Sequence, residues 1–277
     1  MLLASKTRTL DLGRSQVMGI LNLTPDSFSD GGSYTDRDVA LRHALQLVRD
    51  GATIIDVGGE STRPGAAEVS EQQELDRVVP VIERLRQELD CWISVDTSKA
   101  IVMREAVCGG ADLINDVRAL REPGALQVAV DSGAAVCLMH MQGQPRTMQQ
   151  APDYQDVATE VTTFLRERLA ACEAVGIPRQ RICLDPGFGF GKSLKHNYEL
   201  LGRLHRLHDL KLPLLIGMSR KSMIGQLLDR EVSQRLAGSL AAALYAVSQG
   251  AQIIRVHDVK ETADALRVWQ EATQYKG

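Results

Sequence analysis

Short apolar runs recur along the chain, and four of them begin in the same way. A Gly-Ala pair opens GATIIDVGGE, GADLINDV, GAAVCLMHM and GAQIIRVHD, which start at Gly51, Gly110, Gly133 and Gly250. A stretch with helical periodicity precedes these pairs, such as DVALRHALQLVRD before Gly51. A glycine at this point is typical of a helix end that leads through a tight turn into a buried strand.

Four further apolar runs lack the Gly-Ala pair and bring the number of predicted strands to eight. All eight are nearly continuous in apolar residues, which indicates strands covered on both faces, as in a parallel sheet wrapped by helices. The further runs are VMGILNL (17–23), CWISVD (91–96), RICLDPGF (181–188) and PLLIGMS (213–219). Helical stretches between the runs include 71–89, 99–108, 154–175, 197–209 and 234–248.

Eight strand-then-helix units predict one α/β domain, residues 1–277, folded as a (β/α)₈ TIM barrel. An open, doubly wound sheet is the alternative. We expect residues 1–16 to form a small hairpin or strap over the base of the barrel. Polar stretches after the first and second strands predict long βα loops at those two positions.

The composition is that of an ordinary globular protein and narrows the choice of partners. A net charge of −3 supplies no basic field for nucleic acid or a membrane surface, so a bound anion needs a local cluster of cations. The first residues lack the apolar segment of a signal peptide or membrane span, which favours a cytoplasmic protein. Five cysteines lie among apolar neighbours without a CxxC pair, and we interpret them as buried reduced thiols: Cys91, Cys108, Cys137, Cys172 and Cys183.

Every predicted strand ends in a polar or ionisable side chain, and a barrel of this kind carries its active site there. Short polar residues also end strands and cap helices in any α/β protein, and for Asp116 and Asp258 this alternative stays open. Parallel strands align their ends, so four of the residues are predicted to converge on one mouth: Asn22, Asp96, Asn115 and Asp185. The remaining strand ends carry Asp56, His140, Ser219, Arg220, Lys221, Arg255 and His257.

The polar strand ends are predicted to separate by charge around the mouth. Asp96, Asn115 and Asp185 are expected to have no cation beside them, which suits a flat heterocycle with several N–H groups. A cationic wall on the other strands implies a phosphate or diphosphate. The wall comprises Arg63, Lys221, Arg255 and His257. Arg220 is expected to point away from it and to be structural.

The first strand ends at Asn22 and runs into TPDSFSDGG. This stretch is too polar to pack as core and too long for a plain turn, so we interpret it as a mobile active-site lid. Phe28, the large apolar residue within it, is then expected to cover a pocket.

Two further patterns are discounted. GFGFGKS (187–193) resembles a phosphate-binding loop, but three residues separate Gly187 from Gly-Lys-Ser where that loop needs four. We interpret its glycines as letting the backbone approach a ligand below Asp185. The helical histidines lack matching metal ligands. No G-x-S-x-G motif supplies a nucleophile, which favours direct transfer between two bound substrates.

Several long strings resemble the signatures of the bacterial dihydropteroate synthase family. They span all eight predicted strands: GILNLTPDSFSDGG, GATIIDVGGESTRPGA, SVDTSK, IND, LMHMQG, LDPGFGFGK, GMSRKS and IRVHDV. The resemblance implies a homodimeric transferase of folate biosynthesis and a sulfonamide target. Its reaction joins (7,8-dihydropterin-6-yl)methyl diphosphate and 4-aminobenzoate, giving 7,8-dihydropteroate and diphosphate through an SN1-like transfer.

The resemblance also implies a role for each matching residue. The pterin would be held by Asp96, Asn115, Met139, Asp185, Phe190, Gly217 and Lys221. The diphosphate would be held by Asn22, Thr62, Arg63, Arg255 and His257, and Asn22 would also hold Mg²⁺. The 4-aminobenzoate would be held by Phe28, Arg63, Pro64, Phe190, Ser219 and Lys221. The catalytic residues would be Asp96, Asp185 and Lys221.

Two other functions fit a barrel of this kind. A methyltetrahydrofolate-dependent methyltransferase keeps a similar pterin pocket but needs no diphosphate cluster, so Lys221, Arg255 and His257 argue against it. A non-catalytic barrel predicts loss of the mouth residues, and all of them are present.

Overall fold

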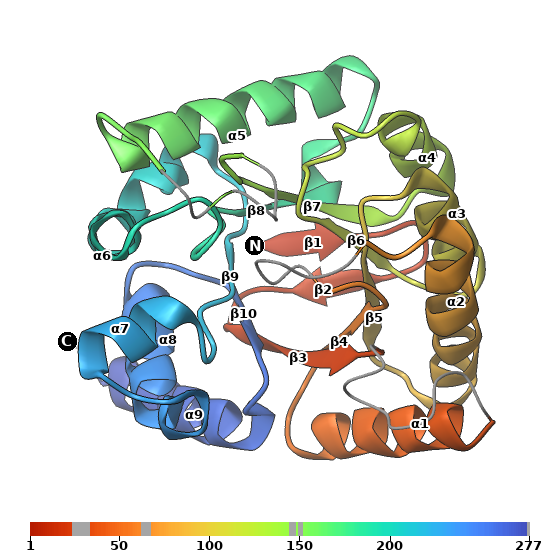
Figure 1. Ribbon diagram of the computed structural model, residues 1–277, viewed down its shortest axis with the longest axis horizontal. Coiled ribbons are helices and arrows are strands. Elements are labelled where there is room, and N and C mark those ends of the chain that lie inside the picture. The colour runs from red at the N-terminus through yellow and green to blue at the C-terminus, as the bar shows by residue number, and fades with distance from the viewer. Residues whose placement is uncertain (24–33, 62–67, 144–147, 149–151, 276–277) are drawn as a thin grey trace.

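Eight parallel strands form one sheet in the order β8-β7-β6-β5-β4-β3-β10-β9. A parallel bridge between Leu184 and Leu214 joins the two outermost strands and closes the sheet into a barrel. The computed structural model describes residues 1–23, 34–61, 68–143, 148 and 152–275. Helices surround the strands as a ring (Figure 1), so the predicted (β/α)₈ barrel is confirmed and the open sheet is excluded.

The elements follow one another in the predicted alternation of strand and helix. The barrel strands are β3 (Gln16–Asn22), β4 (Ile54–Gly58), β5 (Trp92–Asp96), β6 (Leu113–Asp116), β7 (Ala135–Met139), β8 (Ile182–Asp185), β9 (Leu215–Ile216) and β10 (Ile253–Val256). The α-helices are α1 (Tyr34–Arg49), α2 (Glu71–Glu88), α3 (Ala100–Cys108), α4 (Ala125–Ser132), α5 (Val157–Ala174), α6 (Leu194–Gly202), α7 (Ser222–Leu228), α8 (Leu236–Ser248) and α9 (Val259–Gln274). Short 3₁₀ turns are η2 (Arg179–Arg181), η3 (Leu204–Leu210) and η4 (Val232–Gln234).

The glycines of the four Gly-Ala pairs act as predicted. Gly51, Gly110, Gly133 and Gly250 have φ angles of 110°, 116°, 72° and 88°, which residues with a side chain rarely adopt. Each stands just beyond a helix and turns the chain towards the next strand. The apolar residues that follow then pack on both faces of the sheet.

The first residues form a hairpin of β1 (Leu2–Ala4) and β2 (Thr9–Asp11), which confirms the predicted strap. Leu3, Leu10 and Leu12 are buried in one apolar cluster with inward residues of the barrel strands, including Trp92. The hairpin therefore closes the end of the barrel at which the strands begin.

This arrangement predicts that the hairpin contributes to stability. Leu3→Ala is expected to lower the free energy of unfolding by about 2–5 kcal/mol, because the side chain is fully buried and its removal leaves a cavity. Leu2→Ala is the matched control, since Leu2 is on the same strand and is 56% exposed. Urea unfolding of both variants measures the difference, and equal losses would contradict the prediction.

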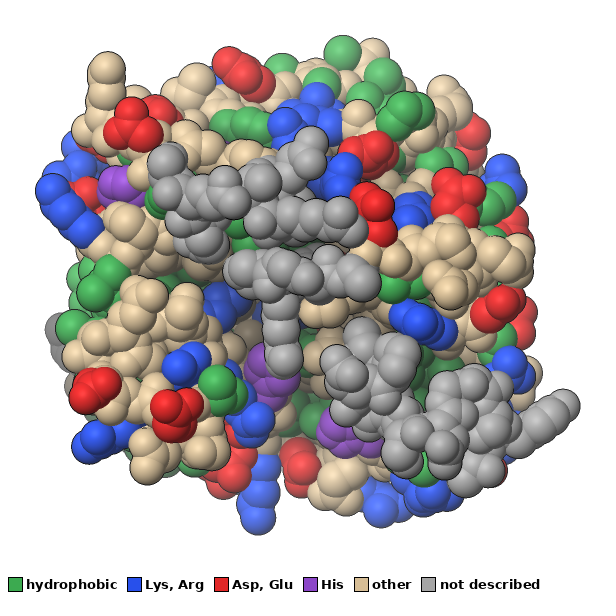
Figure 2. Space-filling view, viewed as in Figure 1, with side chains coloured by type: hydrophobic (Ala, Val, Ile, Leu, Met, Phe, Trp, Pro, Cys, Tyr) green, Lys and Arg blue, Asp and Glu red, His purple; other side chains and the backbone are tan. Residues whose placement is uncertain are grey.

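The outer surface carries both charge signs. Acidic and basic side chains are interspersed over the face shown in Figure 2, as expected for a net charge of −3. Among the described residues, no helix has the length and apolar character needed to cross a membrane.

Candidate active site

Side chains alternate along each barrel strand, so residues two or four positions apart point to the same side. The floor of the interior is apolar and includes Met18, Ile54, Trp92, Leu113, Ala135, Cys183, Leu215 and Ile253. Two residues further along their strands stand Asp56, Asn115, Asp185, Gly217 and Arg255, and four further stand Asn22, Asp96 and Met139. The side chains of these polar strand ends therefore point into the barrel interior, above the apolar floor.

The strand register puts several of these residues at one depth. Asn22 is paired with Gly58, Gly58 with Asp96, and Asp96 with Asn115. Asp185 lies on the far side of β7, paired with Met139. The predicted convergence of the polar strand ends on one barrel mouth is confirmed.

Arg255 crosses the barrel interior and joins two carboxylates. Its Nε donates to Asp56 Oδ2 at 2.6 Å, and its Nη2 donates to Asp96 Oδ2 at 2.8 Å. Asn115 Nδ2 donates to the same oxygen of Asp56 at 3.1 Å. The prediction that Asp96 and Asp185 have no cation beside them is therefore wrong, because Arg255 binds Asp96 and the charge of Lys221 acts on Asp185. The long arginine side chain reaches carboxylates on strands that are not its neighbours, which strand order alone does not reveal.

The interior shifts the pKa values of these groups. Burial raises the pKa of Asp96 to about 7, Arg255 opposes the rise, and the charge of Asp56 adds to it. Burial also raises the pKa of Asp185, and the attraction of Lys221 opposes that rise most strongly. Burial lowers the pKa of Lys221 to about 8. The pKa values of Asp96 and Lys221 thus lie near neutral pH, as is common at active sites.

Lys221 is the cation that faces Asp185. Its Nζ donates to the carbonyl oxygen of Phe188 at 2.6 Å and lies 4.6 Å from the centre of the Phe190 ring. Phe190 packs against an apolar cluster that includes Met139, so the predicted apolar wall is present. A Cβ built on Gly217 would lie 4.0 Å from Lys221 Nζ, so this glycine adjoins the same space.

The ends of β9 and β10 are joined by a serine and a histidine. Ser219 Oγ lies 3.1 Å from His257 Nδ1 and accepts from the backbone N–H of His257 at 3.2 Å. Asn22 ends β3, which is the other neighbour of β10, as predicted. The expected diphosphate contacts of His257 and Asn22 stay predictions.

Three charged residues beside the mouth have structural partners. Arg220 forms an ion pair with Asp258 on the surface, which agrees with its predicted structural role. The side chain of Asp258 makes no capping bond to helix α9, so it is an ion-pair partner. Asp116 accepts from the backbone N–H groups of Arg118 and Leu120 and therefore caps the turn after β6.

Four of the predicted site residues lie outside the described part of the chain: Phe28, Thr62, Arg63 and Pro64. The predicted lid, residues 24–32, lies outside it as well. Shortly before residues 62–67, Glu60 is held by an ion pair. Lys99 Nζ lies 2.5 Å from a carboxylate oxygen of Glu60 and 2.5 Å from one of buried Glu74.

Two interpretations of the sequence need correction. Two glycines of GFGFGKS face protein backbone rather than a ligand: a Cβ on Gly187 would lie 1.9 Å from the carbonyl oxygen of His140, and one on Gly191 would lie 2.3 Å from that of Gln142. Close strand-to-loop packing therefore requires these glycines. Cys108 is exposed at the end of α3, whereas the other four cysteines are buried as predicted.

Sequence reasoning left two residues of the site without a role: Asp56 was named only as a strand end, and Lys192 was not singled out. Asp56 is fully buried and binds both Arg255 and Asn115, and its position two residues beyond inward-facing Ile54 was the available signal. Lys192 is buried beside His140, and no periodic pattern indicated its direction.

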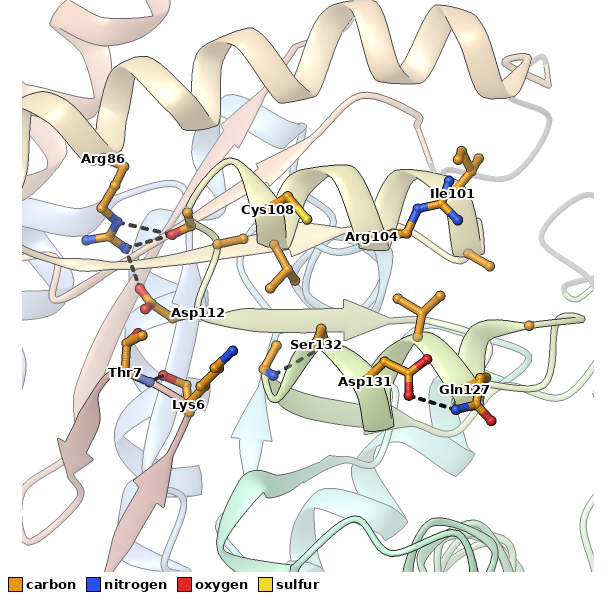
Figure 3. A pocket seen from close by; sticks show the side chains of 18 of the residues that line it. Lys6, Thr7, Arg86, Ile101, Arg104, Cys108, Asp112, Gln127, Asp131 and Ser132 are labelled. Atoms are coloured by element: carbon orange, nitrogen blue, oxygen red, sulfur yellow. Dashed lines mark hydrogen bonds and ion pairs between the residues drawn. The ribbon is translucent and has the colours of Figure 1, made fainter.

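A large groove lies away from the barrel mouth, on the outside of the barrel between α3, α4 and the hairpin loop (Figure 3). It encloses about 1350 Å³ and is lined by Ile101, Arg104 and Gln127, among others. Its central charges satisfy each other, since Arg86 Nη2 lies 2.5 Å from Asp112 Oδ2. None of the strand-end residues lines it, so the groove is separate from the candidate active site.

Comparisons with known proteins identify the family of the chain. Residues 18–257 match the family described as pterin binding enzyme. The dihydropteroate synthase of Escherichia coli K12 is 60% identical over 268 residues, covering 97% of this chain and 95% of that protein. A Yersinia pestis dihydropteroate synthase solved with a sulfonamide drug complex is 59% identical, with a TM-score of 0.94 over 99% of this chain and 100% of that one. The Xanthomonas albilineans enzyme solved with 4-aminobenzoic acid is 52% identical, with a TM-score of 0.93 over 100% of this chain and 99% of that one.

The barrel, the polar strand ends and these similarities agree. The chain belongs to the dihydropteroate synthase family of pterin-binding transferases.

Proposed function

We propose that the chain condenses (7,8-dihydropterin-6-yl)methyl diphosphate with 4-aminobenzoate, giving 7,8-dihydropteroate and diphosphate. The bond between the methylene carbon and the diphosphate oxygen breaks, a carbon–nitrogen bond forms, and the amine loses a proton. The observation that carries the proposal is the inward polar layer in which Asp96, Asn115 and Asp185 face one space beside Lys221.

This layer suits a pterin ring. Two carboxylates and an amide supply acceptors and donors for the ring N–H and amino groups, which a heterocycle of this kind presents along its edges. Met139 and Phe190 supply an apolar wall for its faces. The X. albilineans relative with 4-aminobenzoic acid supports the second substrate.

The charges favour an SN1-like transfer. As the carbon–oxygen bond breaks, positive charge grows on the pterin methylene, and the carboxylates of Asp96 and Asp185 stabilise it. Negative charge grows on the departing diphosphate, and we assign its binding to Asn22, His257, Arg255, and the undescribed Thr62 and Arg63. Lys221 would contact the pterin and, with Ser219, the 4-aminobenzoate.

The proposal includes Mg²⁺ at Asn22. Asn22 is half-buried at the mouth and offers an amide oxygen, a ligand type that Mg²⁺ accepts. The described residues contain no cluster of three His, Cys, Asp or Glu side chains suited to a metal. A single amide oxygen, that of Asn22, fits a cation that keeps several bound waters and is held largely by substrate phosphate. When bound, Mg²⁺ would offset the charge of the leaving diphosphate.

One assay tests the function. The protein is mixed with Mg²⁺, the pterin diphosphate and 4-aminobenzoate, and we expect equal amounts of diphosphate and dihydropteroate, with loss of the rate when EDTA removes Mg²⁺. Binding of the pterin without either product would contradict the proposal. Rapid quenching without 4-aminobenzoate tests the SN1-like path, which predicts some release of diphosphate, and a sulfonamide is expected to compete with 4-aminobenzoate.

We also propose that the chain forms a homodimer. Four large apolar side chains are exposed on neighbouring elements α7, η4 and α8, which supports an apolar contact: Leu227, Leu228, Val232 and Tyr245. Light scattering that gives the mass of a single chain at micromolar concentration would contradict this.

A further inference from the structure

Lys192, in the motif that resembles a phosphate-binding loop, has its ammonium group inside the protein. The residue is 2% exposed. Its Nζ donates to the carbonyl oxygens of Gly187 at 2.8 Å and Phe190 at 3.1 Å, and it lies 2.9 Å from His140 Nδ1. An ammonium group has three N–H donors, and these three partners use all of them. Lys192 therefore has no donor left for a substrate.

The pKa of His140 agrees with this arrangement. Burial, followed by the charge of Lys192, lowers the pKa of His140 to about 2, so its ring is neutral and Nδ1 can accept. Burial lowers the pKa of Lys192 to about 7, and the charge of Asp185 opposes the fall.

The three bonds fix the shape of the turn at residues 187–190. The carbonyl groups of Gly187 and Phe190 both point at the ammonium group, and the N–H of Phe190 also donates to Gly187. On the other side, Asn197 Oδ1 accepts from the N–H of Gly189 at 2.7 Å. The turn is thus held from two sides, by a buried cation and by a helix side chain.

The same turn contacts two residues of the proposed active site. The N–H of Gly187 donates to Asp185 Oδ1 at 2.7 Å, and the carbonyl oxygen of Phe188 accepts from Lys221 Nζ at 2.6 Å. A Cβ added at Gly189 would lie 3.2 Å from Lys221 Cδ, so the turn also borders the stem of that lysine. A shift of the turn would therefore move the lysine and the carboxylate together.

We propose that Lys192 is a positioning residue, whose ammonium group holds the 187–190 turn in the shape that aims Lys221 and Asp185 at the pterin. The proposal rests on the proposed function of this site. Removal of the cation releases both carbonyl groups, and small displacements of reacting groups cost large factors in rate.

The test compares Lys192→Met with Arg181→Met. Lys192→Met is expected to raise KM for the pterin diphosphate about tenfold and to lower kcat per folded molecule about tenfold. Arg181 donates from Nε to the carbonyl oxygen of Ala134 at 2.8 Å, at the opposite end of β8. Arg181→Met is therefore expected to lower the melting temperature but to leave KM and kcat within about twofold of the wild type.

Several outcomes overturn the positioning role. They are an unchanged KM and kcat in folded Lys192→Met, an equal change in Arg181→Met, or recovery of normal kinetics at low temperature. If Lys192→Met does not fold, Lys192→Gln decides, because its neutral amide keeps two N–H donors and predicts a smaller rise in KM. Loss of folding in both variants assigns Lys192 to stability alone. A wild-type chain that makes no dihydropteroate contradicts the proposed function instead.

Discussion

Replacement of Lys221 by methionine is expected to lower kcat/KM for the pterin diphosphate by about 10³-fold while the barrel stays folded. The ammonium group adjoins the inward polar layer and is the strongest influence that lowers the pKa of Asp185. Methionine keeps the length of the stem and its contact with Phe190, but it removes the charge. Asp185 is then a buried carboxylate without its main counter-charge, so its pKa is expected to rise further.

This consequence gives the prediction a signature in pH. If ionised Asp185 binds the pterin, the acid side of the kcat/KM profile reflects its protonation in the free enzyme. A higher pKa moves the fall in rate to higher pH, so Lys221→Met is expected to recover partly as the solution becomes more alkaline. Initial rates between pH 6 and 10 measure this.

The neighbouring cation is the control. Arg220→Met removes a positive charge one residue away, but that charge is paired with Asp258, and the arginine side chain is 42% exposed. Exposed pairs contribute about 0–1 kcal/mol, so activity and stability are expected to stay close to those of the wild type. Equal losses in the two variants would show that general charge, rather than the position of Lys221, determines the rate.

Much of the fold was predictable because its signals are local. Glycines at helix ends and continuous apolar runs predict the alternation of helix and strand, and parallel alignment then brings Asn22, Asp96 and Asn115 to one depth. The boundaries shifted by a few residues, and the stretch at 197–209 divides into α6 and η3.

The errors concern contacts across the barrel. Arg255 was expected to belong to a separate cationic wall, but its side chain spans the interior to Asp56 and Asp96. Such a contact depends on barrel closure and side-chain length, neither of which strand periodicity encodes. Lys192 was missed for a related reason. The glycine turn determines where its side chain points, and this cannot be inferred from the residues next to it in the sequence.

Asp56 joins the strand-end residues Arg255 and Asn115 through hydrogen bonds in the barrel interior. It is fully buried, and one of its oxygens binds both Arg255 and Asn115. Among the described residues, its other oxygen, Oδ1, has no hydrogen-bond partner, and neither has Oγ of Ser94, its register neighbour on β5. Asp56 and Asp96 thus place two carboxyl groups on the one guanidinium of Arg255.

Asp56→Asn is therefore expected to change the pH dependence of the enzyme. The charge of Asp56 is one of the influences that raise the pKa of Asp96 to about 7. Its removal lowers that pKa, so Asp96 stays ionised in more acidic solution. If ionised Asp96 binds the pterin, the acid side of the kcat/KM profile moves to lower pH. At pH 8, where Asp96 is ionised in both proteins, kcat/KM is expected to fall about 10²-fold, because Arg255 and Asn115 lose the carboxylate that orients them.

The stability of the variant is expected to change less than its activity. The asparagine keeps one carbonyl oxygen as an acceptor, and Arg255 keeps its bond to Asp96, so we expect a loss of about 2 kcal/mol. Asp56→Ala removes the acceptor as well, so the loss in free energy of unfolding is expected to approach the value of about 3–5 kcal/mol that is typical of a broken buried ion pair.

Asp112→Asn is the matched control for this experiment. Asp112 is also buried and bound to an arginine, since its Oδ2 lies 2.5 Å from Arg86 Nη2, but it lies beside the outer groove. Its substitution is expected to cost stability without moving the pH profile. A profile of Asp56→Asn that stays in place or moves to higher pH, or an equal shift in Asp112→Asn, would show that the charge of Asp56 does not control Asp96. The expected result, a shift to lower pH confined to Asp56→Asn, would instead establish that Asp56, a residue without an assigned substrate contact, raises the pKa of the pterin-binding carboxylate of Asp96.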